Sequence, residues 1–170
     1  MFSVNEYVIY GIYGVCKIID IVEREICGRR GKFYVLKPVF EDKATVYIPV
    51  SNPELTAKMR RILSAEEIHK LIRNISSTKI VWIENEQDRK KEYSRILSGG
   101  DRSELILMIK SIYTHRQELL ERKKKLHICD ENFMKDAEKI LYEEFAHVLN
   151  IKRSQVVPFI AEQIEVEERH

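Results

Sequence analysis

The hydrophobic pattern of this chain changes its period near Asn52, and this change limits the possible folds more than any other feature. Before it, the segments "EYVIY", "GVCKIIDIVERE", "GKFYVLKPVF" and "ATVYIPV" are rich in Val, Ile, Tyr and Phe, as short strands are. After "NPEL", apolar residues recur at the spacing of amphipathic helices. The pattern predicts an α+β chain, with a small antiparallel β module over residues 1–52 and an all-helical domain over residues 53–170.

Turn residues support the β module. The segment "CGRRG", from Cys27 to Gly31, has the glycines that a tight hairpin turn needs, because glycine readily adopts a positive φ. Such a turn would present Arg29 and Arg30 at an exposed tip.

Capping residues support the helical domain. Ser64 and Glu67 have the spacing of a capping box, and Asp101 and Glu104 repeat it directly after Gly100, a residue suited to ending a helix. We expect "SSTKIVW" to be a connector after two short helices. The longer helices are expected in "ENEQDRKKEYSRIL", "ELILMIKSIYTHRQELLERKK", "DENFMKDAEKILYEEFAHVLN" and "SQVVPFIAEQI".

Composition excludes several classes of protein. The 170 residues are 44% hydrophobic and 33% charged, which is ordinary for a chain that folds around its own core. No apolar run reaches the roughly 18 residues that span a bilayer, and the N-terminus lacks the pattern of a signal peptide, so we expect a cytoplasmic protein. The three cysteines, Cys16, Cys27 and Cys129, have no CxxC spacing and predict neither a disulfide framework nor a zinc site.

Charge is distributed unevenly along the chain. Residues 88–125 contain eleven Lys or Arg against six Asp or Glu, whereas residues 130–170 contain five against ten. If the protein binds a polyanion, residues 88–125 are therefore expected to contact it. The basic stretches "DRKKEY" and "ERKKK" in this middle part could be solvated helix surface or a surface for phosphates, and they could lie along one edge or at opposite ends of a helix pair.

Catalytic and cofactor motifs are absent from the sequence. It contains no GxGxxG, GxxxxGK[ST], GxSxG or HExxH pattern. His127 and Cys129 could supply two metal ligands, but nothing near them in the sequence completes a set of four. We therefore predict a protein that is not an enzyme and needs no cofactor, metal or small-molecule ligand.

The order of these segments resembles the CarD/CdnL family of bacterial transcription regulators, whose N-terminal module also occurs in the transcription-repair coupling factor. In the first part the resemblance is carried by "VNEYVIYGIYGVCKIIDIV", "GKFYVLKPVF" and "ATVYIPVSN". In the helical part it is carried by "ILSGGDRSELILMIKSIYTHRQEL" and "DENFMKDAEKILYEEFAHVL". The collinear set spans nearly the whole chain.

The resemblance implies that the two parts of the chain bind different partners. A Tudor-like module would bind the RNA polymerase β subunit by adding its sheet to a strand of the partner. The helical domain would reach promoter DNA at the upstream edge of the transcription bubble, largely without sequence specificity, and stabilise the open complex. The protein would then be associated with the nucleoid through RNA polymerase.

The resemblance also implies residues for the polymerase contact. The arginine that family members place shortly before the hairpin turn corresponds to Arg24, and Tyr47 occupies the place of a second arginine, where it loses the charge but can still bury area. Arg29 of the hairpin tip is assigned to the same contact.

For DNA, the family places a tryptophan wedge at the start of a basic helix. Counting back from Gly100-Asp101, that position falls near Glu86, and Trp82 lies four residues earlier. Trp82 could still reach DNA, or it could be a packed connector residue. Arg89, Lys90 and Lys91 are expected to contact phosphates. The alternative to this regulator is an adaptor that docks on polymerase without touching DNA.

Overall fold

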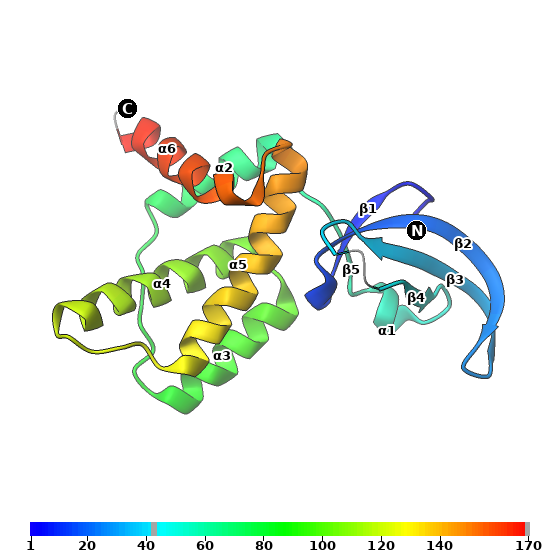
Figure 1. Ribbon diagram of the computed structural model, residues 1–170, viewed down its shortest axis with the longest axis horizontal. Helices are drawn as coiled ribbons and strands as arrows, with labels where there is room; N and C mark the ends of the chain where they lie inside the picture. Colours follow the sequence, from blue (N-terminus) through cyan, green and yellow to red (C-terminus); the bar gives the residue numbers. More distant parts are fainter. Residues whose placement is uncertain (42–43, 169–170) are drawn as a thin grey trace. The chain divides into compact units, whose positions relative to one another are not determined.

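The computed structural model describes residues 1–41 and 44–168, and the chain divides into two compact units, Met1–Leu63 and Ser64–His170. The first unit is built on one antiparallel sheet and the second consists of helices (Figure 1). The predicted α+β class is confirmed. No helix in the described part of the chain is long and apolar enough to cross a membrane.

The sheet of the first unit has the strand order β4-β3-β2-β1-β5, and every neighbouring pair of strands is antiparallel. Strands β2 and β3 are the longest and form a hairpin, whose turn contains Cys27 and Gly28 at positive φ. The elements are β1 Tyr7–Tyr10, the 3-10 turn Gly11–Tyr13, β2 Val15–Ile26, β3 Arg29–Pro38, β4 Val46–Pro49, α1 Pro53–Thr56 and β5 Met59–Arg61.

The first unit extends past residue 52, the boundary expected from the pattern change. Asn52 does begin a helix, since its side chain accepts bonds from the amides of Glu54 and Leu55, but that helix is a single turn. The chain then adds β5 to β1, with Ile9 opposite Arg60. A strand this short has no readable alternation, and its pairing joins residues far apart in sequence.

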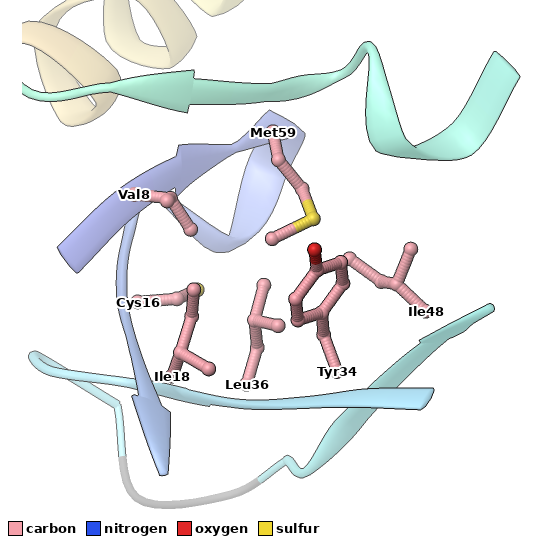
Figure 2. Close-up of a cluster of buried hydrophobic side chains, with 7 residues drawn as sticks. All are labelled: Val8, Cys16, Ile18, Tyr34, Leu36, Ile48 and Met59. Carbon is pink, nitrogen blue, oxygen red and sulfur yellow. The ribbon is translucent and has the colours of Figure 1, made fainter. Parts of the chain in front are cut away.

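The core of the first unit lies on one face of the sheet, where Figure 2 shows seven side chains turned toward a common space. Each aliphatic side chain fully removed from water contributes about 1.5–3 kcal/mol. The cluster consists of Val8, Cys16, Ile18, Tyr34, Leu36, Ile48 and Met59.

A β-bulge in β2 changes which residues face this core. Ile18 lies opposite Leu36, but the next register pair is Asp20 with Val35, so Ile19 is an extra residue. Before the bulge even-numbered residues face the core; after it they face the other side of the sheet, which we call the outer face. Asp20, Val22, Arg24 and Ile26 therefore lie on the outer face.

The second unit consists of five helices and one 3-10 turn within the described residues. The capping box of Ser64 and Glu67 is confirmed, since the Ser64 side chain accepts from the Glu67 amide at 3.1 Å and Glu67 accepts from the Ser64 amide at 2.8 Å. The helices are α2 Ala65–Ser76, α3 Glu86–Gly99, α4 Arg102–Glu121, α5 Ile128–Leu149 and α6 Val156–Glu168, and the 3-10 turn is Arg153–Gln155.

The connection between α3 and α4 also follows its sequence signals. Gly100 ends α3 in the left-handed conformation at φ 66°, and Asp101 caps α4 by accepting a bond from the Glu104 amide at 3.0 Å. The three helices α3, α4 and α5 then share a buried cluster of Tyr93, Ile96, Leu105, Met108, Ile112, Met134 and Ala137.

Candidate functional site

Strand β4 forms one edge of the sheet in the first unit (Figure 1). The amide of Val50 donates to the Lys32 carbonyl at 3.0 Å, which makes these two residues a hydrogen-bonded pair. Bonded and non-bonded pairs alternate along an antiparallel ladder, so the pair Val35 and Tyr47 is non-bonded. The backbone N–H and C=O of Tyr47 consequently point away from β3, toward the free edge.

The three residues assigned to a polymerase contact lie on one face of this sheet. Directly opposite residues of antiparallel strands share a face, and the register pairs Arg24 with Gly31, Ile26 with Arg29, and Val35 with Tyr47. Arg24, Arg29 and Tyr47 are all exposed on the outer face. No ion pair in the described part of the chain involves either arginine, so both are available to a partner.

Arg89 of α3 departs from the expected phosphate-contacting role, because its side chain is only 4% exposed. Its Nε and Nη2 donate to the two carboxylate oxygens of Asp130 in α5, at 2.8 and 2.9 Å. Its Nη1 donates to the carbonyl of Ile83 at 3.0 Å. The charge and the donors of Arg89 are therefore used inside the second unit, and Arg89 is removed from the set of DNA contacts.

Trp82 lies in the connector between α2 and α3 and is packed against its own unit. The indole stacks on the ring of His115 with the centroids 3.8 Å apart, and the Arg89 guanidinium lies 4.6 Å from its centroid. Ser111 fixes the same connector by donating to the carbonyl of Val81 at 3.3 Å. This geometry favours the packed connector residue over a free wedge, since the indole already has two stacking partners.

The remaining cations of α3 differ in their availability. Lys90 pairs with Glu86 at 3.3 Å, and the hydrogen bond and charge of Lys90 lower the pKa of that carboxyl. Arg95 bonds both Glu92 and Glu104, which raises the pKa of its guanidinium. Lys91 is exposed and has no ion-pair partner among the described residues.

The richest free positive charge lies between α4 and α5, in the four consecutive exposed residues Arg122–Lys125, which we call the basic loop. Its backbone is held down, because the amides of Lys123 and Lys124 donate to the carbonyls of Leu120 and Leu119. Leu126 then packs on the buried cluster of α3, α4 and α5. No ion pair involves these four cations within residues 1–41 and 44–168.

The basic loop and the first turns of α3 lie at the same end of the second unit. The loop leads into the first turn of α5, where the Cys129 thiol lies 3.8 Å from Glu86, the first residue of α3. This contact places the start of α5, which follows the basic loop, beside the start of α3. The sequence assignment chose the stretch around Arg89 and passed over "ERKKK", although the run of consecutive cations is plain in the sequence.

Among the residues that the structure describes, no group of three or more His, Cys, Asp or Glu side chains is placed to hold a metal ion. Cys129 faces Glu86 rather than a second thiol or imidazole.

Replacing Asp130 with Ala should lower the free energy of unfolding by about 3–5 kcal/mol, because the Arg89 charge would stay buried without a partner. Denaturant unfolding followed by circular dichroism measures this loss. Glu92→Ala breaks an exposed Arg–Glu pair instead and should leave stability nearly unchanged. Equal effects of the two substitutions would contradict the structural role given to Arg89.

Trp82→Ala should lower the free energy of unfolding by about 2–3 kcal/mol, because a partly buried indole loses its stacking partners and its packing against the cluster. The fluorescence of Trp82 should also stay unchanged when forked promoter DNA is added. A large spectral change on adding DNA, with unchanged stability of the alanine variant, would instead identify Trp82 as a DNA-contacting tip.

Comparison with known proteins bears on the first unit. Residues 2–63 match the CarD-like/TRCF RID domain, and this range covers the first unit almost from end to end. No curated protein matches the chain significantly. The matched range contains the small antiparallel sheet, in which β4 is an edge strand. The N-terminal unit of this chain therefore belongs to the CarD-like/TRCF RID family and is an RNA polymerase-interacting domain.

Proposed function

We propose that this chain is a transcription regulator that docks on the β subunit of RNA polymerase and contacts promoter DNA at the upstream edge of the bubble, thereby stabilising the open complex. The observation that carries the proposal is the free β4 edge, with Arg24, Arg29 and Tyr47 exposed on the face beside it. Such an edge accepts a strand of a partner through backbone hydrogen bonds, and neighbouring side chains set the specificity.

The polymerase contact is built from backbone and side chain together. The N–H and C=O of Tyr47 offer one donor and one acceptor to an added strand, and the 39% exposed ring offers area next to them. Arg24 and Arg29 add two free guanidinium groups on the same face, which suit carboxylates of the partner.

The DNA contact is assigned to the basic loop, with Lys91 and Lys90 at the same end of the second unit. Lysine and arginine side chains neutralise phosphates with little sequence preference. This surface would therefore bind the phosphate backbone of the duplex beside the bubble. Trp82 and Arg89 support this end from within rather than touching DNA. Stabilisation of the open complex then comes from tethering upstream DNA to polymerase, with no covalent step.

Tyr47→Pro should abolish measurable binding to RNA polymerase core enzyme. Proline removes the edge N–H, but it leaves the β3 ladder intact because that N–H points away from β3. Biolayer interferometry with the full chain measures the affinity. Tyr47→Val is the matched control, since it keeps the N–H and strand propensity, and it should weaken binding by no more than about fivefold. Full binding by a folded Tyr47→Pro variant would contradict docking through β4.

Three double variants with the same change of charge test the DNA contact. Lys124→Glu with Lys125→Glu should weaken binding to forked promoter DNA most and reduce the salt slope of log K by roughly 0.7–0.9 for each phosphate that is no longer neutralised. Lys90→Glu with Lys91→Glu should have a smaller effect, because Lys90 is already paired. Lys70→Glu with Lys135→Glu, on exposed surfaces of α2 and α5, should change binding least.

A second function remains in competition, namely an adaptor that docks on polymerase without touching DNA. It is favoured by the packing of Trp82 and the burial of Arg89, which remove two expected DNA contacts. If all three double variants are retained at promoters to the same extent and still bind polymerase, the adaptor explains the result and the DNA contact does not.

A further inference from the structure

Large apolar side chains are exposed beside the basic loop. Leu120 is 55% exposed and lies two positions before the loop, and Ile128 is 75% exposed and follows the loop at the start of α5. Positive charge and apolar surface are therefore interleaved here. Among the described residues of the second unit, the exposed large hydrophobic side chains are Val81, Tyr113, Leu120, Ile128 and Val157.

The apolar surface continues from the basic loop along one face of α4. Tyr113 is followed by Arg116, Gln117 and Leu120 at spacings of three, four and seven residues, which places all four on the same side of the helix. At a rise of 1.5 Å per residue, Tyr113 lies about 14 Å along α4 from Arg122, the first residue of the loop. We call this surface the Tyr113 face.

The ring of Tyr113 lies next to a cation and is open to a partner. The Arg116 guanidinium is 5.3 Å from the centroid of the ring. The side chain is 50% exposed, and no aromatic ring in the described part of the chain stacks on it. A planar aromatic surface beside a guanidinium is thus available to another planar group.

The Tyr113 face is predominantly basic. Glu118 lies on another side of α4, where its carboxylate is 3.8 Å from His115. Glu121 follows the last residue of the face and lies about 100° from it around the helix. Glu138 of α5 interacts with Arg116, but burial raises the pKa of this carboxyl and so favours its neutral form. The face and the basic loop together therefore attract an anion.

We propose that the Tyr113 face and the basic loop bind single-stranded DNA, with an unpaired base stacked on Tyr113 and phosphates held by Arg116 and the loop. The proposal rests on the proposed contact with promoter DNA and names the form of DNA recognised there, namely a strand opened within the bubble. Stacking on an aromatic side chain needs a base whose flat face is free, and single strands supply such bases. Leu120 and Ile128 offer apolar surface to the bases beside the loop.

Duplex DNA and protein suit this surface less well. The cations alone would serve a duplex, whose bases are stacked on one another, and Tyr113 and Leu120 would then stay in water. The centres of protein interfaces are depleted of charge and especially of lysine, whereas the Tyr113 face runs into four consecutive cations.

Tyr113→Ala in the full chain tests the proposal, with fluorescence anisotropy of a labelled single-stranded DNA oligonucleotide as the readout. Loss of the ring should weaken binding of the single strand by about fivefold or more, because base stacking is lost. Binding of a duplex of the same length should change by less than about twofold, because its phosphates still meet the cations. The melting temperature should stay the same, since half of the side chain is already in water.

Three further variants separate stacking from other effects of the substitution. Tyr113→Phe keeps the ring and should bind the single strand within about twofold of the unaltered chain. Tyr113→Leu keeps apolar packing on α4 without the flat ring and should show the same loss as Tyr113→Ala. Tyr13→Ala removes an exposed tyrosine of the first unit and should leave the binding of both DNAs unchanged.

The outcomes separate this inference from the DNA contact on which it rests. If Lys124→Glu with Lys125→Glu weakens binding to forked promoter DNA while Tyr113→Ala and Tyr113→Leu bind the single strand normally, the loop contacts DNA without base stacking and the inference is overturned. Equal losses for single strand and duplex would also overturn it. If the double lysine variant binds forked DNA normally, the proposed DNA contact itself has failed.

Two other occupants are excluded by the same variants. If Tyr113→Ala weakens binding to RNA polymerase core enzyme and not to single-stranded DNA, the occupant is a protein and the inference is overturned. If RNA of the same sequence binds more tightly than the DNA strand and depends on Tyr113, the surface belongs to the transcript rather than to the open promoter, and the inference is again overturned.

Discussion

The buried pair of Arg89 and Asp130 organises the helical unit. Through two parallel hydrogen bonds it joins the first turn of α3 to the first turn of α5, and its third nitrogen holds the backbone of the connector that precedes α3. The guanidinium also lies over Trp82, which in turn stacks on His115 of α4. One arginine thus links three helices and a connector. Because its charge and its hydrogen-bond donors are used inside the unit, they are not available to a partner.

This arrangement changes which positive charges matter. In the sequence, the cations of α3 and those after α4 are equal candidates for phosphates, and only the family resemblance favours the helix. In the folded unit Arg89 is buried, Lys90 and Arg95 are paired, and the four exposed cations of the basic loop form no ion pair with the residues that the structure describes. Availability depends on the surroundings of each charge rather than on the number of basic residues in a segment.

Sequence reasoning succeeded where the signal is local. The capping box at Ser64, the cap at Asp101 and the helix end at Gly100 each depend on residues a few positions apart, and all three formed as expected. The four strand patterns also gave strands, two of them only four residues long. Sequence reasoning failed where a residue far along the chain decides the outcome. Strand β5 forms because it pairs with β1, and Arg89 is buried because it pairs with Asp130. Nothing in the sequence near either segment indicates these partners.

The bulge at Ile19 takes one extra residue of β2 out of the ladder, so the residues after it keep the pairing with β3 that they would have without Ile19. Every side chain after it, from Asp20 to Ile26, owes its face to Ile19 lying outside the ladder. Deleting Ile19 would place Asp20 directly after Ile18 and leave Arg24 on the outer face, whereas pairing Ile19 with Val35 in a regular ladder would turn Arg24 toward the core face and bring Glu23 and Glu25 to the outer face. The sign of the charge presented beside the hairpin is therefore set by the bulge: it stays the same whether the extra residue is bulged out or absent, and it reverses only when that residue enters the ladder.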